Sequence, residues 1–176
     1  MDFRNLNHAC PKDNFPTPFI DQIIDDYAGH KALSFMDGFS GYNQIQIHPA
    51  DQYKTAFTTP WGTFSYHFMP FGLKNDGTTF QWVMTYIFHD LAEIILAYLD
   101  DLTTRSKKRT QHLDDLRIIF QRCRQYNIHL NPLKCVFCIT AGRLLSFIIA
   151  QSSITVDPLK VKAITEIPPP RNLRQI

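Results

Sequence analysis

The chain has 176 residues, of which 44% are hydrophobic and 19% are charged, and this balance excludes a disordered protein. No apolar run approaches the roughly 20 residues that a membrane-spanning helix requires, and the charged start of the chain lacks the apolar core of a secretory signal. We therefore expect one intracellular globular domain with four reduced cysteines and no membrane contact.

Charge is distributed unevenly along the chain. Through Thr104 the sequence has 5 Lys and Arg against 12 Asp and Glu, whereas from Arg105 onward the numbers are 13 and 4. An acidic part could hold cations and a basic part could hold a polyanion. Ordinary solvated surface explains the same asymmetry, so charge alone leaves the function open.

Periodicity predicts the elements of the first 70 residues. A short amphipathic helix is expected after Pro18, with its end at Gly29. A buried strand follows over 33–37, and the polar-apolar alternation of 44–47 is also typical of a strand. Alternating residues on either side of a Pro-Trp-Gly turn, within 55–68, predict a β-hairpin with one buried face.

Later elements show the same two periodicities. They are a helix over 80–91, a strand over 94–98 that ends in a tight turn at 99–101, a helix over 113–123, strands over 134–139 and 143–150 around a turn at 140–142, and a helix that begins at Asp157-Pro158 and runs to Ile164. This mixed order indicates an α+β fold, in which helices cover one face of an antiparallel sheet.

Two carboxylate sites stand at the ends of predicted strands. Asp37 ends one strand just before Gly38, and Asp100 and Asp101 follow another. Acids at such positions cost solvation energy unless a turn exposes them or cations pair with them. Ordinary exposed turns are one interpretation. The other is a cradle for two Mg²⁺ ions, which need few protein ligands when a substrate supplies phosphates, and hence metal-assisted phosphoryl transfer.

Five motifs, in a fixed order, carry a family resemblance. They are DFRNLN at 2–7, FMDGFSGYNQI at 35–45, KTAF at 54–57, MPFGLKN at 69–75 and YLDD at 98–101. In this order and spacing the chain resembles the reverse transcriptase of Ty3/gypsy-type LTR retrotransposons. The similarity continues through 130–135 and 157–164, so it spans nearly the whole chain.

The resemblance implies a single reverse transcriptase domain fragment over 1–176. Its fold would be a polymerase palm, a ferredoxin-like antiparallel sheet with helices on one face, plus part of the fingers. Partial fingers and connection would occupy 1–32 and 44–74, the palm 33–43 and 75–165, and a linker toward a missing thumb 166–176. The implied activity is RNA-directed DNA polymerisation, the transfer of a deoxynucleotide to a primer 3′-hydroxyl with two Mg²⁺ or Mn²⁺ ions.

The resemblance also assigns site residues. Asp37 and Asp100 would be the principal metal ligands and catalytic residues, with Asp101 in support. The nucleotide-binding residues would be Tyr42, which blocks a 2′-hydroxyl, Phe71 and Gly72, which line the nucleotide pocket, and Lys134, in the region of a general acid for pyrophosphate. Contacts with nucleic acid would come from Arg4 and Gln81. Tyr42 as an ordinary core aromatic and Lys134 as a solvated lysine remain open alternatives.

The implied partners are an RNA or DNA template with its primer and deoxynucleoside triphosphates. In an intact element they include the protease, ribonuclease H and integrase portions of a polyprotein, with a cytoplasmic, virus-like-particle location. The chain departs from the family pattern at Asp76-Gly77-Thr78, where Ala-Pro-Ala is usual, and at Ser146, where Gly is usual.

Competing hypotheses follow from these departures and from the apparent lack of flanking fingers and thumb segments. One alternative is a catalytically inactive retroelement remnant that at most binds nucleic acid. Another is a cation-binding or cyclase-like palm domain. The aromatic at Tyr42 and the MPFGLKN segment favour a templated polymerase over that last alternative.

Overall fold

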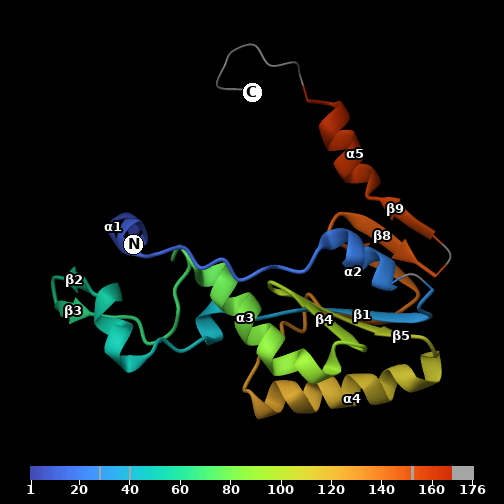
Figure 1. Cartoon of the computed structure of the whole chain (residues 1–176), viewed down its shortest axis with the longest axis horizontal. Coiled ribbons are helices and arrows are strands. Elements are labelled where there is room, and N and C mark those ends of the chain that lie inside the picture. Colours follow the sequence, from blue (N-terminus) through green and yellow to red (C-terminus); the bar gives the residue numbers. More distant parts are fainter. Residues whose placement is uncertain (28, 40, 152, 168–176) are drawn as a thin grey trace.

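A computed structural model describes residues 1–167 apart from 28, 40 and 152. Figure 1 shows a layered unit of sheet and helices beside a smaller part that contains α1, β2 and β3. The expected linker over 166–176 lies outside the described residues from 168 onward.

Four antiparallel strands form the main sheet in the order β4-β5-β1-β6. Their bounds are Ala32–Asp37 for β1, Ile95–Tyr98 for β4, Asp101–Ser106 for β5 and Val136–Ile139 for β6. Strand β1 pairs with β5 without interruption, from Ala32 opposite Ser106 to Asp37 opposite Asp101. This register places the end of β1 beside the turn of the β4–β5 hairpin.

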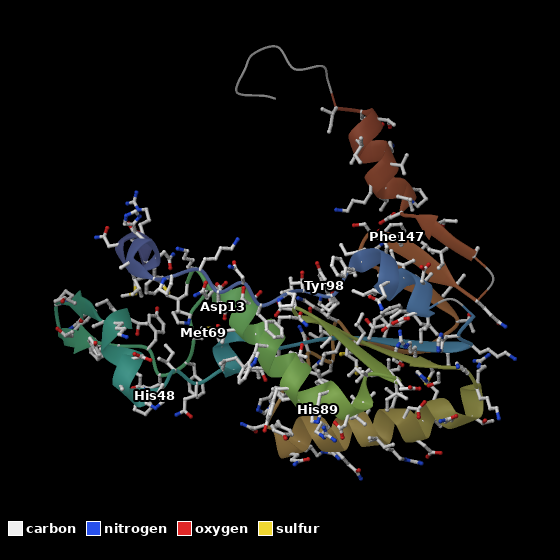
Figure 2. All side chains as sticks on the ribbon, viewed as in Figure 1. Asp13, His48, Met69, His89, Tyr98 and Phe147 are labelled. Atoms are coloured by element: carbon white, nitrogen blue, oxygen red, sulfur yellow. The ribbon has the colours of Figure 1, made fainter. Side chains whose placement is uncertain are left out.

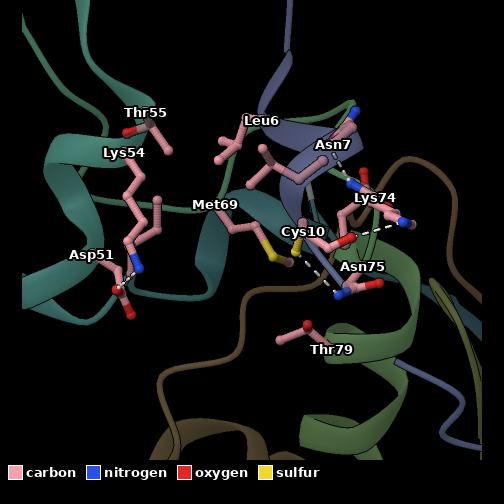
Figure 3. Close-up of a pocket in the computed structure, with 13 residues that line it drawn as sticks. Leu6, Asn7, Cys10, Asp51, Lys54, Thr55, Met69, Lys74, Asn75 and Thr79 are labelled. Carbon is pink, nitrogen blue, oxygen red and sulfur yellow. Dashed lines mark hydrogen bonds and ion pairs between the residues drawn. The ribbon is translucent and has the colours of Figure 1, made fainter. Parts of the chain in front are cut away.

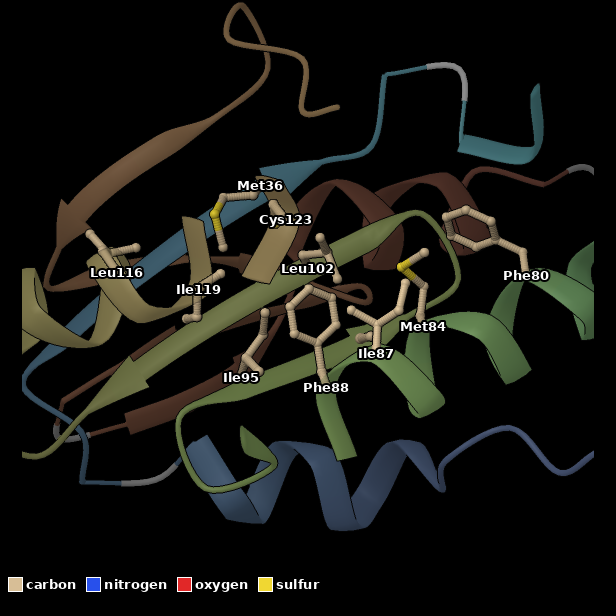
Figure 4. Close-up of a cluster of buried hydrophobic side chains, with 11 residues drawn as sticks. Met36, Phe80, Met84, Ile87, Phe88, Ile95, Leu102, Leu116, Ile119 and Cys123 are labelled. Carbon is tan, nitrogen blue, oxygen red and sulfur yellow. The ribbon is translucent and has the colours of Figure 1, made fainter. Parts of the chain in front are cut away.

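Helices α3 (Asp76–Phe88) and α4 (Arg109–Gln125) cover one face of this sheet. Their apolar residues recur every three or four positions and meet the strands in one buried cluster, which Figure 4 shows. Met84 of α3 and Ile119 of α4 have no exposed surface. The predicted helices over 80–91 and 113–123 are therefore confirmed, and α3 begins four residues earlier than its apolar stripe.

The opposite face is covered by α2 (Ile20–Tyr27) and a small sheet of three strands. These strands are β7 (Ala141–Leu144), β8 (Phe147–Ala150) and β9 (Ser153–Val156). Tyr27 donates a hydrogen bond to Thr103 O at 3.0 Å, and Arg105 lies over its ring. The expectation that helices cover one face is confirmed by α3 and α4. The other face is covered as well, because β1 buries apolar side chains on both sides, Leu33 on one and Met36 on the other.

Helix α5 (Pro158–Thr165) begins as predicted, with Asp157 as its N-cap accepting a hydrogen bond from Leu159 N at 3.0 Å. It projects away from the layered unit (Figure 1). The predicted strand over 143–150 was wrong, because the chain turns at Leu145 and Ser146, where φ is +50° and +83°. That stretch forms a hairpin of β7 and β8.

The smaller part contains only short elements. They are α1 (Arg4–Ala9), the 3₁₀-helices η1 (Gly41–Gln44) and η2 (Pro49–Thr55), and the strands β2 (Phe57–Thr59) and β3 (Gly62–Phe64). The predicted hairpin is confirmed as β2–β3, but the prediction of a buried face is wrong, because Phe64 is 50% exposed. The predicted strand over 44–47 is reduced to an isolated bridge between Gln46 and Phe68.

No helix in the described part of the chain combines the length and the apolar character that crossing a membrane would require.

Candidate active site

A two-residue turn of Leu99 and Asp100 joins β4 to β5 at one end of the main sheet. Leu99 has a φ of +51°, which a tight hairpin requires at this position. Gly38 N, just beyond β1, donates a hydrogen bond to Asp100 O at 3.1 Å. Figure 2 shows Tyr98 at this end of β4, beside α3. The hairpin turn and the end of β1 are thus joined into one unit.

The three predicted carboxylates all belong to this end of the sheet. Asp37 lies opposite Asp101 across β1 and β5, and Asp100 precedes Asp101 in the turn. Desolvation raises the pKa of Asp100, and the charges of Asp37 and Asp101 raise it further. The pKa of Asp101 is also raised by desolvation and then by Asp37, while Lys134 lowers it. Negative charge is therefore concentrated at this site, a condition that a bound cation would relieve.

Asp100 carries the most informative atom of the site. Its Oδ1 is buried and has no hydrogen-bond partner within the described structure. Such an atom is costly and calls for an explanation, which can be an ion. A Cβ on the buried Gly41 would overlap this oxygen and would lie 3.1 Å from Phe80 Cζ. Glycine at this position therefore leaves the space that Asp100 fills.

Carboxylate oxygens are the donors that Mg²⁺ and Mn²⁺ prefer, so these residues fit a divalent cation by chemistry. Within the described residues, no three His, Cys, Asp or Glu side chains are gathered into a complete metal-binding group. Asp37 Oδ2 instead pairs with Lys134 Nζ at 3.3 Å. This arrangement resembles a partial set of ligands, which suits a cation that keeps waters and takes substrate phosphates.

A cavity of about 540 Å³ opens beside Asp37 and Asp101. Lys134 and Arg143 also line it, so that acids and bases face the same space. Arg143 Nε is held by the buried carboxylate of Asp157 at 2.9 Å. Arg143 could not be predicted as a site residue from the sequence, because a single basic residue in a short strand carries no periodic signal.

Aromatic residues form the side of the site toward the smaller part. The ring of Tyr42 packs edge-on against Phe71 and Phe80, with ring centres 5.1 and 5.3 Å apart. Burial raises the pKa of Tyr42, and the charges of Asp100 and Asp76 raise it further. Tyr42 thus belongs both to an aromatic cluster and to the surroundings of Asp100, while Phe71 remains 56% exposed.

The two residues expected to contact nucleic acid lie in different environments. Gln81 is 1% exposed, and its amide donates to Ala97 O at 2.9 Å and accepts from Leu99 N at 2.8 Å. Its side chain therefore supports the β4–β5 hairpin from the interior of the protein. Arg4 is exposed on α1 and pairs with Asp2 at 2.6 Å.

Asp76, which departs from the family pattern, is the first residue of α3. Its carboxylate accepts hydrogen bonds from Gly72 N at 3.0 Å and from Gly77 N at 2.7 Å. Negative charge in the first turn of a helix is favourable. The aspartate that replaces the usual family residue is therefore hydrogen-bonded to the backbone both before and after it.

Comparisons with known proteins agree with this geometry. Residues 1–162 match the family model of the reverse transcriptase (RNA-dependent DNA polymerase). The Retrovirus-related Pol polyprotein from transposon 297 of Drosophila melanogaster is 33% identical over 100% of this chain and 17% of its own length. The corresponding polyprotein from transposon gypsy is 30% identical over 97% of this chain and 16% of its own length. The chain thus spans less than a fifth of these relatives.

Solved structures of the foamy viral protease-reverse transcriptase share the fold. The complex with double-stranded DNA has a TM-score of 0.88 at 21% identity, and covers 99% of this chain and 31% of that one. The complex with an RNA/DNA hybrid has a TM-score of 0.83 at 21% identity, with coverages of 99% and 24%. The expected α+β architecture of palm and fingers is confirmed. With its ordered motifs, its sheet-end carboxylates and relatives that align along its length, the chain belongs to the reverse transcriptase family, as a domain of a Ty3/gypsy-type retrotransposon polyprotein.

Proposed function

We propose that this chain carries the nucleotidyl-transfer site of an RNA-directed DNA polymerase, which joins a deoxynucleotide to the 3′-hydroxyl of a primer. The observation that carries the proposal is the buried, unpartnered Oδ1 of Asp100 beside the cross-strand pair of Asp37 and Asp101. In this proposal the palm comprises 33–43 and 75–165, while 1–32 and 44–74 supply partial fingers and connection.

The three carboxylates have unequal roles. Asp37 and Asp100 would be the principal ligands of two Mg²⁺ or Mn²⁺ ions, and Asp101 would support them from the same turn. When bound, the ions supply positive charge that stabilises the oxygens of the transferring phosphoryl group. The protein contributes the rigid backbone, since Gly38 N and the amide of Gln81 hold the hairpin in place.

Selection of a deoxynucleotide is assigned to the aromatic side of the site. Tyr42 is held between Phe71 and Phe80, so its ring cannot move aside cheaply. A ring fixed in this way would exclude a sugar that carries a 2′-hydroxyl. Phe71 and Gly72 would line the rest of the nucleotide pocket, and Gly72, with a φ of +94°, leaves the backbone open to a close approach.

The basic residues of the site would donate a proton to pyrophosphate and contact the phosphate backbone of the nucleic acid. Lys134 is 64% exposed at its side chain and lies beside Asp37, where it could donate a proton to departing pyrophosphate. Arg143 shares the cavity and would face the backbone of the primed strand. Arg4 on α1 would contact the template. The protease, ribonuclease H and integrase portions of a polyprotein are the proposed partners in an intact element.

Primer extension tests the proposal. The purified chain is given a primed RNA or DNA template, deoxynucleoside triphosphates and either Mg²⁺ or Mn²⁺. We expect extension that Asp100→Asn reduces by at least 100-fold, because that change removes a charged ligand. Asp114→Asn is the matched control, since Asp114 is exposed on α4 and pairs only with Arg117 among the described residues.

The same assay separates the alternatives. A wild-type chain that binds the primed template but never extends it would establish the inactive remnant instead. Extension by Asp100→Asn at the wild-type rate would exclude the assigned ligand. Tyr42→Ala should admit ribonucleotides; unchanged discrimination in that variant would return Tyr42 to the role of an ordinary core aromatic.

A further inference from the structure

Two segments far apart in the sequence are joined by a pair of asparagine side chains. Asn7, on α1, donates from Nδ2 to Gly72 O at 2.7 Å and accepts at Oδ1 from Lys74 N at 2.8 Å. Both polar atoms of the Asn7 amide are therefore hydrogen-bonded to the backbone of residues 72 and 74. Figure 3 shows Asn7 and Lys74 facing each other across the two segments.

The second asparagine makes the reciprocal connection. Asn75 donates from Nδ2 to Pro11 O at 2.9 Å and accepts at Oδ1 from Asp13 N at 3.1 Å. Lys74 Nζ adds a hydrogen bond to Cys10 O at 2.7 Å. We call Asn7 and Asn75, together with the backbone groups that they bind, the asparagine clasp.

Apolar packing does little to hold these segments together. Helix α1 has no buried residue among those described. A cavity of about 190 Å³ lies between Leu6 of α1 and Met69, so these side chains do not pack tightly against each other. The hydrogen bonds of the clasp thus join α1 to the 72–75 segment without a buried side chain from that helix.

The clasp determines the backbone at Gly72. Asn7 takes the carbonyl of Gly72, and Asp76 accepts from its N–H at 3.0 Å. Gly72 has a φ of +94°, and because glycine lacks a Cβ, its own structure does not restrict the backbone to this conformation. Phe71 comes directly before it and packs on Tyr42 at 5.1 Å. Loss of the bond from Asn7 would release the backbone that aims Phe71.

We propose that Asn7 is a positioning residue for the incoming deoxynucleotide. By holding the backbone of Gly72 and Lys74, it keeps Phe71 and Gly72 in the arrangement that receives the nucleotide. This inference rests on the proposed function for its substrate, but the clasp itself is independent of that function. Asn7 touches neither the carboxylates nor the reacting atoms, so it affects nucleotide binding more than the chemical step.

Two measurements on the full chain test the inference. Amide hydrogen exchange at Lys74 reports the clasp directly, because Asn7 Oδ1 is the acceptor for that N–H. Asn7→Ala should speed this exchange by roughly tenfold, the effect of losing about one net hydrogen bond. The second measurement is primer extension: Asn7→Ala should raise the KM for deoxynucleotide by roughly tenfold and leave the Kd for the primed template unchanged.

Matched variants give the controls. Asn5→Ala changes the same residue type on the same helix, where the side chain is exposed and outside the clasp, and both readouts should stay at wild-type values. Asn7→Asp keeps the acceptor for Lys74 N but loses the donor to Gly72 O. It should therefore protect the Lys74 amide partly and give an intermediate KM.

Each result decides one point. Unchanged exchange at Lys74 in Asn7→Ala would overturn the clasp. Faster exchange with an unchanged KM for deoxynucleotide would overturn the positioning role and leave a purely structural contact. A wild-type chain that extends no primer would defeat the proposed function, and with it the assigned substrate, while the exchange rates would still decide whether Asn7 holds the segment.

Discussion

Gly41 is the residue on which the position of Asp100 depends most. Any side chain at Gly41 would overlap Asp100 Oδ1 and crowd Phe80. We predict that Gly41→Ala displaces the carboxylate, lowers primer extension by at least 100-fold and costs about 1–3 kcal/mol of unfolding free energy. Extension under single-turnover conditions and urea unfolding measure the two effects.

Gly77→Ala is the control for this prediction. A Cβ at Gly77 would meet only ordinary contacts, 3.6 Å from the Tyr42 hydroxyl, in the first turn of α3. Alanine is favoured over glycine in a helix, so this variant should gain about 0.5–1 kcal/mol of stability. If Gly41→Ala behaved like Gly77→Ala, close packing of Asp100 would not be a requirement of the site.

Ser146 is a residue under backbone strain. Its φ of +83° belongs to a region that side chains disfavour, at the turn between β7 and β8. Replacement by glycine removes a penalty of about 1 kcal/mol, so Ser146→Gly should raise the unfolding free energy by about that amount. Ser146→Ala keeps the Cβ and should give no gain in the same denaturation experiment. Equal stability of the two variants would show that the turn relaxes at no cost.

At the scale of elements, a buried network of side-chain hydrogen bonds attaches α4 to the main sheet. His112 of α4 is 1% exposed and bonds to Ser34 Oγ of β1 and Ser106 Oγ of β5, each at 2.7 Å. Ser106 in turn donates to Asp115 of α4 at 2.5 Å. With that donor direction, Nδ1 of His112 carries the proton and Nε2 accepts from Ser34, so a neutral ring satisfies every partner.

This buried hydrogen-bond network makes the stability of the protein depend on pH. Burial lowers the pKa of His112 below its usual value of 6.5, with Asp115 opposing the shift. Because the unfolded chain binds this proton more readily, the contribution is fully present above about pH 6.5 and is lost as the pH falls through the lower, folded value. We predict that His112→Gln removes this part of the pH dependence and costs about 1–3 kcal/mol at neutral pH.

Thermal unfolding between pH 7.5 and 5 measures the effect, with His8→Gln as the control on the exposed face of α1. An identical pH profile in wild type and His112→Gln would assign the titration to another group.

Elements differ in how far the sequence predicts them. Helices α3 and α4 could be predicted because their apolar residues repeat over several turns and face one layer. The alternation at 44–47 predicted a longer strand than the one that forms. Pairing with the 67–69 segment is limited to the bridge of Gln46 and Phe68 and the two backbone hydrogen bonds that flank it. The side of the sheet on which α2 packs could not be predicted, because β1 is apolar on both faces.

At the scale of the whole molecule, the uneven charge of the sequence is partly neutralised by pairs between its two parts. Arg105 pairs with Asp26 at 3.2 Å, Lys134 with Asp37 at 3.3 Å, and Arg122 with Asp90 at 2.6 Å. Acids of the first part thus meet bases of the second. Part of the charge asymmetry therefore serves to join the two parts of the sequence in the fold.

Arg122 gives the sharpest test of this pairing. Its guanidinium binds both carboxylate oxygens of Asp90 and also donates to Ile87 O at 2.6 Å. Arg122→Ala should lower the free energy of unfolding measured in urea, because it removes an ion pair with two hydrogen bonds and leaves Ile87 O without this partner. Arg117→Ala removes only an exposed pair within α4 and should stay within about 0.5 kcal/mol in the same urea experiment. Equal losses would make the pairing between the two parts incidental.

Those residues of the candidate site that belong to recognisable motifs could be predicted from the sequence. Asp37, Asp100 and Asp101 stand at strand ends in a sequence of known motifs, so their meeting could be anticipated. Asn7 could not be assigned, because its partners are backbone groups of a segment more than 60 residues away. Gln81 was expected at nucleic acid because the motif gives its position but not the direction of its side chain.

Strand β1 is synthesised early and paired late. Both of its neighbours in the sheet come later, and β6 follows it by about a hundred residues. At a translation rate of about 5–20 residues per second, the nascent β1 waits roughly 5–20 s for its second partner. Until β5 has been made, this apolar strand has unpaired backbone on both edges, and one edge stays unpaired until β6 follows. Unpaired strand edges favour aggregation. Protection by chaperones until residue 139 has left the ribosome would therefore govern how much of this polypeptide reaches its folded form.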